Sequence, residues 1–269
     1  MTETFDLSLE QAHAYEDLFV PALFAQWVPV LLRTAGVGPG QHVLDVACGT
    51  GVVARQAAAL VGPSGHLSGV DLNPAMIEVA RERASAVDWR VGDAAELPYD
   101  DGSFDAVLCQ SALFFFPDPA RAIGEMARVG RPGGVVALQT YAGLDEQPAY
   151  GPFVRAVVRH AGEDARAYLG TYWSRGDFSE LRTLLEGAGL EPALPENVLG
   201  VVRFPSMDAF VHTEIQGTPL AGRIDEPTFR AIAQDVRATL RTFEDADGGV
   251  RLPIRARFVA GRRRVTSAR

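Results

Sequence analysis

The chain has 269 residues, of which 47% are hydrophobic, and its formal net charge is −9. This length suits one large α/β domain or two small ones, and the apolar content is sufficient for a full core. The acidic balance argues against a general nucleic-acid binder, because such proteins neutralise phosphates with a surplus of positive charge.

The cysteine count and the start of the chain bear on its compartment. Two cysteines, Cys48 and Cys109, suggest no disulfide framework and favour a reducing cytoplasm. No charged start followed by an apolar core resembles a signal peptide, and we find no uninterrupted run of about 18 apolar residues. We therefore expect a cytoplasmic protein with neither a membrane nor a nucleic acid as partner.

Two helical stretches are predicted before the first strand. The segment Ser8-Leu9-Glu10-Gln11 fits a capping box that opens a helix through about Phe19. A second stretch, rich in Leu, Val, Phe and Trp, runs from Pro21 to Ala35. The glycine-rich segment Gly36–Gly40 then predicts a loop.

From His42 onward, short apolar runs alternate with helical patterns, which indicates a mostly parallel sheet covered on both faces. Asn73-Pro74 is a typical helix start, with an N-cap residue followed by proline at the first helical position. The predicted strands are His42–Val46, His66–Val70, Trp89–Val91, Ala106–Gln110 and Val135–Thr140, and the predicted helices are Val52–Leu60, Pro74–Ala84 and Pro119–Val129.

After Thr140 the alternation becomes less regular. Helices are predicted at Tyr150–Ala161, Phe178–Gly187, Ser206–Ile215 and Pro227–Thr242, and strands at Val198–Phe204 and Ile254–Gly261. We see no internal repeat, low-complexity segment or long linker.

The run V-L-D-V-A-C-G-T-G at residues 43–51 carries most of the functional information. An apolar strand ends near Asp45 and passes into a turn where Gly49 and Gly51 let the backbone approach a ligand. The same residues fit G-x-G-x-x-A, the dinucleotide fingerprint, and Asp71 ends the next strand where a ribose-binding acid belongs. The glycine motif alone therefore leaves a dehydrogenase and a methyltransferase open.

Two further segments favour the methyltransferase. The run G-D-A-A-E-L-P-Y-D-D-G-S-F-D-A-V at 92–107 and the run E-M-A-R-V-G-R-P-G-G at 125–134 follow the glycine turn. From about His42 to Thr140 the chain resembles the class I S-adenosylmethionine-dependent methyltransferases, in particular the small-molecule type 11 or UbiE-like group. The resemblance implies a Rossmann-like sheet of seven strands with helices on both faces, N-terminal helices and a cap insertion.

The resemblance also implies one methyltransferase domain over residues 1–269. It would comprise N-terminal helices (1–40), a cofactor-binding core (41–140), a cap with later sheet elements (141–249), and a last strand with its tail (250–269). In this layout the strands near Val198–Phe204 and Ile254–Gly261 would be the sixth and seventh, with the seventh antiparallel.

Cofactor roles carry over from the family by motif position. Asp45 would orient the ammonium group, Asp71 would bind both ribose hydroxyls, and Asp93 would accept from the adenine amino group. Tyr15 would close over the methionine end, where aromatic faces attract a sulfonium. The full implied set is Tyr15, Asp45, Ala47, Gly49, Gly51, Asp71, Leu72, Met76, Asp93, Ala94 and Gln110.

The expected reaction is in-line transfer of a methyl group to a small, apolar or aromatic acceptor through O, N or C, without a metal. No catalytic residue is assigned; candidate bases are His13, His160, His212, Tyr141 and Tyr172. The acceptor pocket is expected from the N-terminal helices and the segments after Thr140, with Tyr172 and Phe210 as test positions.

Two alternatives remain open. One is a nicotinamide-dependent oxidoreductase, although the chain contains no lysine and therefore lacks the usual Tyr-x-x-x-Lys pair of the short-chain enzymes. The other is a non-catalytic S-adenosylmethionine-binding protein, because the cofactor-binding part of its sequence would carry the same motifs.

Overall fold

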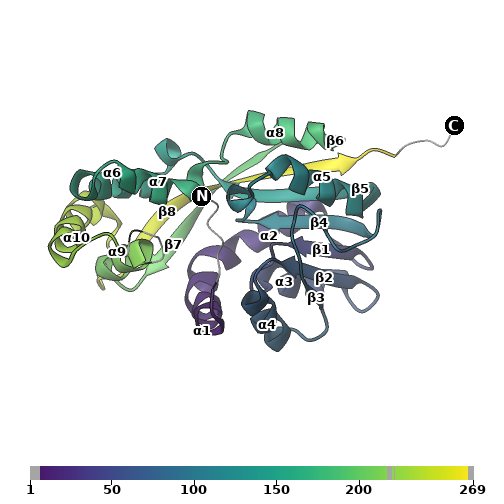
Figure 1. Ribbon diagram of the computed structural model, residues 1–269, viewed down its shortest axis with the longest axis horizontal. Coiled ribbons are helices and arrows are strands. Elements are labelled where there is room, and N and C mark those ends of the chain that lie inside the picture. Colours follow the sequence, from purple (N-terminus) through teal and green to yellow (C-terminus); the bar gives the residue numbers. More distant parts are fainter. Residues whose placement is uncertain (1–6, 217–219, 221, 266–269) are drawn as a thin grey trace. The chain divides into compact units, whose positions relative to one another are not determined.

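The computed structural model describes residues 7–216, 220 and 222–265, and the chain forms two compact units (Figure 1). The first unit comprises Met1–Thr140, Arg175–Asn197 and Arg257–Arg269, and the second comprises Tyr141–Ser174 and Val198–Ala256. The expected organisation as one methyltransferase domain with a cap insertion stays a prediction.

A twisted sheet organises the first unit, with strand order β3-β2-β1-β4-β5-β8-β6. The neighbouring pairs from β3 to β5 are parallel, whereas β6 runs antiparallel to β8. These strands are β1 (His42–Val46), β2 (His66–Asp71), β3 (Asp88–Val91), β4 (Phe104–Gln110), β5 (Gly130–Tyr141), β6 (Leu190–Pro192) and β8 (Val250–Arg263). The Rossmann-like fold class predicted from the sequence is confirmed.

The end of the sheet differs from the expected layout. The strand predicted near Val198–Phe204 exists as β7 (Glu196–Phe204), but it lies off the main order and pairs with β8. The strand that follows β8 at the end of the main order is instead the three-residue strand β6, Leu190–Pro192. A segment this short offers too little alternation to be recognised from the sequence.

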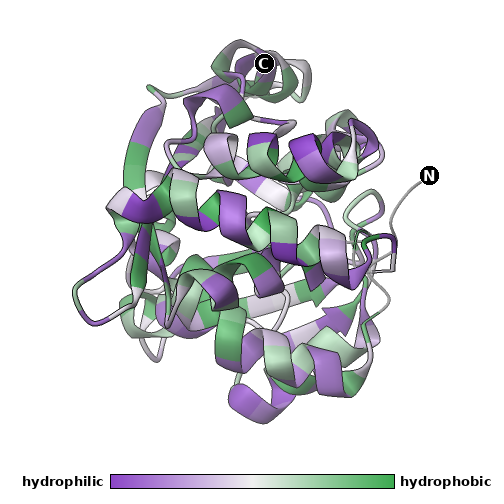
Figure 2. Ribbon diagram, turned by 90° about the vertical axis from the view of Figure 1, so that its left-hand side faces the viewer, coloured by the Kyte–Doolittle hydropathy of each residue, from purple (hydrophilic) through white to green (hydrophobic). Residues whose placement is uncertain are grey.

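Helices pack on the sheet through their apolar faces. Figure 2 shows hydrophobic and hydrophilic bands alternating along the helices, as expected for elements with one buried side. The helices of this unit are α1 (Leu9–Ala14), α2 (Val28–Ala35), α3 (Val52–Val61), α4 (Pro74–Arg83), α5 (Pro119–Val129) and α8 (Phe178–Gly187), with short 3₁₀ turns at Ala25–Trp27 and Leu113–Phe115. A large cluster joins α5 and α8 to the strands through Ile123, Met126, Leu181, Val107 and Leu138.

The N-terminal helices form one continuous run, Leu9–Ala35, rather than two helices separated near Pro21. The capping box is confirmed, because the Ser8 and Gln11 side chains each bond the other's backbone N–H. Pro21 lies inside a π-helix, Tyr15–Phe24. The predicted break is wrong because the wider hydrogen-bond pattern accommodates a residue that lacks an N–H.

By length and composition alone, Leu9–Ala35 could cross a membrane, with a mean hydropathy of 1.4 in its most apolar window. The segment contains no uninterrupted run of about 18 apolar residues. Core helices of soluble proteins pass the same test, and 39% of that window is buried within the protein. Trp27 and Leu31 are fully enclosed, and the Trp27 ring packs against Phe258.

The second unit has its own aromatic core. It contains α6 (Tyr150–Ala161), α7 (Asp164–Gly170), α9 (Met207–Gln216), α10 (Glu226–Leu240), the 3₁₀ turns Leu144–Glu146, Thr171–Trp173 and Arg241–Phe243, and parts of β7 and β8. Helix α7 was not predicted from the sequence. Phe210 is completely buried, and its ring lies 4.9 Å from that of Phe153 and 5.4 Å from that of Phe204.

Two polar contacts fix elements within this second unit. The guanidinium of Arg159 on α6 donates to both carboxylate oxygens of Asp235 on α10, at 2.9 and 2.8 Å. Buried Gln147 exchanges hydrogen bonds with the backbone of Arg255, at 2.8 and 2.9 Å. The α6–α10 pair and the start of β8 are thereby tied to defined neighbours.

Candidate cofactor site

The site begins where β1 ends and the glycine turn leads into α3. Ala47, Gly49 and Gly51 all have positive φ angles, of 54°, 53° and 87°. The left-handed conformation is easy for glycine but costs a residue with a Cβ about 1–2 kcal/mol. Ala47 therefore carries backbone strain at a predicted cofactor position, and such strain gathers at functional sites.

Asp71, at the end of β2, holds this turn in place. One carboxylate oxygen accepts from the Gly49 N–H at 2.8 Å, and the other accepts from the Asn73 N–H at 2.9 Å. Each oxygen keeps further acceptor capacity, which the predicted ribose contacts require. Burial raises the pKa of Asp71, although the two backbone donors oppose that rise.

Asp45 lies beneath the same turn and is only 1% exposed. Its carboxylate accepts from the N–H of Ala54 in the first half of α3, at 3.3 Å. Burial raises the pKa of Asp45 to about 8, and the negative charge of Asp71 adds to the effect. A buried and a half-buried carboxylate that interact electrostatically make this end of the sheet a place where a cationic ligand is favoured.

The two motif glycines face different neighbours. A Cβ on Gly49 would stand 3.7 Å from the Tyr15 ring, whereas a Cβ on Gly51 would stand 2.3 Å from the ring of Trp89 on β3. Gly69 on β2 meets the same indole at 2.2 Å. Gly49 therefore leaves room beside Tyr15, and Gly51 is required by packing against Trp89.

Tyr15 is brought to the turn by the π-helix. Its ring stacks with those of Phe19 and Phe24, at centroid distances of 6.1 and 5.3 Å. The structure thus places Tyr15 beside Gly49, and its expected role at the methionine end stays a prediction.

A polar cluster that sequence reasoning missed anchors the same helix. Glu16 accepts from the Thr50 hydroxyl in the turn and forms an ion pair with Arg55 on α3, at 2.7 Å. The Arg55 guanidinium also donates to the Thr50 carbonyl. Because Glu16 and Arg55 are 39 residues apart, no local pattern could have revealed this pair.

Gln110 and Ser111 line the end of β4. The Gln110 Nε2 donates to the Phe24 carbonyl at 3.1 Å, while its Oε1 is buried without a hydrogen-bond partner among the described residues. Ser111 has a positive φ of 54°, and its hydroxyl bonds Gln139 of β5. An orphaned acceptor next to a strained residue is a feature that a ligand donor would satisfy.

The residues predicted to contact the adenine are partly exposed and partly buried in the core. Leu72 is 60% exposed, whereas Met76 is buried against Ala12 and Val79. Asp93 is exposed and accepts from the Ala95 N–H at 2.8 Å. Ala94 is half-buried and packs against the core of the first unit. Met76 thus has a packing role of its own, and the adenine contacts stay predictions.

The candidate bases are scattered rather than gathered. The Nε2 of half-buried His13 lies 3.4 Å from the Glu82 carboxylate, and that of His160 lies 3.0 Å from the Asp235 carboxylate. Of the others, His212 is exposed beside the Phe229 ring, Tyr141 is buried against Trp173, and Tyr172 is half-buried. In the described part of the chain, no three His, Cys, Asp or Glu residues are grouped so as to hold a metal ion.

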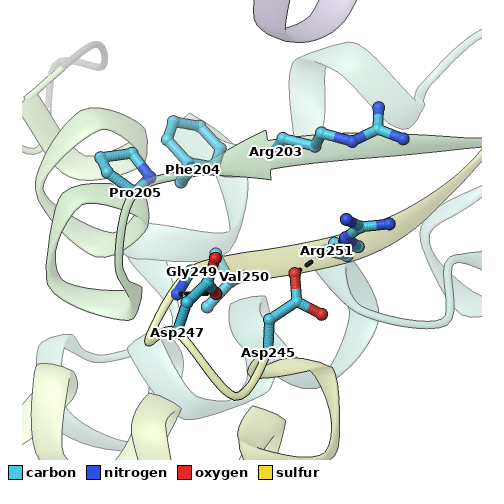
Figure 3. Close-up of a pocket in the computed structure, with 8 residues that line it drawn as sticks. All are labelled: Arg203, Phe204, Pro205, Asp245, Asp247, Gly249, Val250 and Arg251. Atoms are coloured by element: carbon cyan, nitrogen blue, oxygen red, sulfur yellow. Dashed lines mark hydrogen bonds and ion pairs between the residues drawn. The ribbon is translucent and has the colours of Figure 1, made fainter.

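One open cavity lies away from the predicted cofactor site. Figure 3 shows this open space of about 280 Å³ in the second unit, lined by residues near the β7 and β8 ends such as Arg203, Phe204 and Asp247. Its Arg251 pairs with Asp245 at 2.8 Å. None of the residues implied for cofactor binding lines it.

The residues present at the strand ends fit S-adenosylmethionine. The ligand has an ammonium, a sulfonium and a ribose. Among the described residues the site offers buried Asp45, half-buried Asp71, an aromatic face and the unpaired Oε1 of Gln110. A pyrophosphate would instead bring negative charge toward Asp45 and Asp71, which like-charge repulsion disfavours.

Comparisons with known proteins agree with this geometry. A family model described as a methyltransferase domain matches residues 44–138. The demethylmenaquinone methyltransferase of Symbiobacterium thermophilum is 31% identical over 189 residues, covering 64% of this chain and 75% of that protein. That of Staphylococcus aureus strain JH9 is 40% identical over 118 residues, covering 42% of this chain and about half, 49%, of that protein.

A solved structure shares the fold. The putative methyltransferase of Bacillus halodurans aligns with a TM-score of 0.60 and 20% identity, over 88% of this chain and 99% of that one. The nicotinamide-dependent alternative therefore falls away, and S-adenosylmethionine is the cofactor. This chain belongs to the class I S-adenosylmethionine-dependent methyltransferases of the small-molecule, UbiE-like group.

Proposed function

We propose that this methyltransferase transfers a methyl group in line to a small, apolar or aromatic organic acceptor. The observation that carries the proposal is the pair of carboxylates, buried Asp45 and half-buried Asp71, around the strained turn after β1. The bound cofactor supplies a methyl group already activated by its sulfonium, so the leaving thioether is neutral. The protein's tasks are then to orient the two reactants and to exclude water.

Each predicted residue takes one of these tasks. Asp45 holds the ammonium as its counter-ion, and Asp71 binds the ribose while it braces Gly49. Tyr15 covers the methionine end from the π-helix, and the Gln110 Oε1 accepts a donor from the same part of the ligand. Leu72, Met76, Asp93 and Ala94 form the adenine side.

An aromatic or apolar acceptor remains after other acceptor classes are eliminated, and it fits the analogy with the relatives. The first relatives are demethylmenaquinone methyltransferases. A phenolic acceptor ionises easily and needs no strong base, in keeping with the scattered positions of the histidines. We therefore assign no general base, and we place the reaction in the cytoplasm.

The test has two steps. Isothermal titration of the full chain with S-adenosylmethionine should give one binding site, whereas NAD should give no heat of binding. A screen of hydroxylated and amino-substituted aromatic acceptors, read out as released S-adenosylhomocysteine, then identifies the acceptor class. Binding without turnover across the whole screen would favour a non-catalytic cofactor-binding protein and would overturn the proposal.

A further inference from the structure

A small, partly open pocket lies inside the second unit and has no assigned role. Its walls include the rings of Tyr150, Phe153, Tyr172 and Trp173 and the carboxylate of Glu214. All five residues belong to the second unit. We call this space the aromatic–carboxylate pocket.

Glu214 is held at the wall of this pocket by one hydrogen bond. The Tyr150 hydroxyl donates to its Oε1 at 3.0 Å. The Tyr150 ring lies 4.8 Å from that of Trp173 and 6.4 Å from that of Phe153. The carboxylate thus projects from α9 into surroundings that are otherwise aromatic and aliphatic.

The charge of Glu214 has no cationic partner among the residues that the structure describes. Two arginines of this unit pair with other acids, in the Arg159–Asp235 and Arg251–Asp245 ion pairs. Burial raises the pKa of Glu214 to about 7, even though the Tyr150 hydroxyl opposes that rise. A carboxylate this poorly compensated gains free energy from any cation that can reach it.

The walls of the pocket select the kind of cation. Aromatic faces attract an ammonium group through their quadrupoles. The cavity measures about 10 Å³, which is near the lower limit for one water molecule, and therefore for one –NH₃⁺ group. A metal ion such as Ca²⁺ needs six to eight oxygen ligands, which one carboxylate among aromatic rings does not supply.

We propose that the aromatic–carboxylate pocket binds the primary ammonium group of a small organic amine, with Glu214 as its counter-ion. Tyr172 and Glu214 are half-buried, whereas Tyr150, Phe153 and Trp173 are buried. The carbon skeleton of the amine therefore leaves the pocket beside Tyr172. This site goes beyond the proposed methyl transfer and needs no bound cofactor.

The experiment uses the full, cofactor-free chain labelled with 5-fluorotryptophan. The chain has three tryptophans, and W173F identifies the fluorine resonance that reports on the pocket. Benzylamine and its neutral counterpart benzyl alcohol are titrated separately, and potassium chloride provides a cation without a carbon skeleton. Each titration is repeated with E214Q, which can still accept from Tyr150, and with E226Q as an exposed control on α10.

We expect benzylamine to shift the Trp173 resonance saturably and to bind at least tenfold more tightly than benzyl alcohol. E214Q should remove this preference, while E226Q should retain it. Equal affinity for the amine and the alcohol in the wild-type chain would overturn the proposal without reliance on any variant. Saturation by potassium but not by benzylamine would also overturn it, by indicating a metal-ion site.

Discussion

Replacement of Asp45 by asparagine tests whether a buried carboxyl lies ready for a cation. Asp45 is fully enclosed, and burial raises its pKa from the ordinary 3.8 to about 8. The unfolded chain loses the Asp45 proton near pH 4, whereas the folded chain retains it until about pH 8. The folded state of the cofactor-free protein therefore loses stability as the pH rises through this window, and asparagine removes that loss.

The magnitude follows from the two pKa values. Each pH unit inside the window costs the folded state about 1.4 kcal/mol, so the penalty between pH 5 and pH 8 is at most about 4 kcal/mol. Water entry and relaxation around the charge reduce this to ~2 kcal/mol. We therefore expect the unfolding free energy of D45N minus that of the wild type to increase by ~2 kcal/mol from pH 5 to pH 8.

The assay is urea denaturation of the cofactor-free proteins at several pH values, with D145N as a control at an exposed aspartate. Parallel pH profiles for wild type and D45N would refute the reasoning. Calorimetry gives a second readout, because a bound ammonium ionises Asp45. The affinity of the wild type for S-adenosylmethionine should rise with pH up to about pH 8, and that of D45N should not. At pH 8 the loss of this charge-assisted contact should weaken binding in D45N by ~10- to 100-fold.

Three further substitutions test the turn and the second unit. Gly51→Ala should lower the unfolding free energy by ~2–5 kcal/mol, because the new Cβ would clash with Trp89 in a left-handed backbone conformation. The control Gly36→Ala is equally left-handed but faces open space, so it should cost only ~1–2 kcal/mol. Equal losses in the two variants would mean that the Trp89 indole moves aside. Asp71→Ala should weaken cofactor binding by on the order of 1.5–3 kcal/mol per lost contact in calorimetry. It should also lower the melting temperature, because two backbone N–H groups lose their acceptor, and an unchanged affinity would make Asp71 purely structural. Phe210→Ala should cost ~3–5 kcal/mol in urea denaturation, since the ring is fully buried, and a loss of turnover without a loss of stability would restore its expected role in the acceptor pocket.

The sequence determined the local features of this protein. Strand and helix periodicity located β1 to β5 and α3 to α6 within a few residues, because burial on one face imposes a short-range repeat. The glycine turn and the acids at the ends of β1 and β2 could likewise be identified, since parallel strands bring their carboxyl ends to one edge of the sheet. These features sufficed to identify the family.

The tertiary structure alone decided which distant residues meet. Nothing near Gly51 indicates that Trp89 fills the space beside it, and nothing near Glu16 indicates Arg55 as its partner. The contact between Tyr150 and Glu214 spans 64 residues. Such contacts depend on how whole elements pack, and packing combines the shapes of many side chains that no local pattern contains.

The same reason explains two of the errors in the predicted secondary structure. Proline at position 21 normally predicts a helix boundary, but the surrounding core keeps the Leu9–Ala35 run helical by widening its turns. Leu190–Pro192 is a strand because β8 offers it hydrogen-bond partners, and its three residues have no strand periodicity of their own. In both places the tertiary environment outweighed a weak local preference, because burial and hydrogen bonding over many residues exceed the propensity of one.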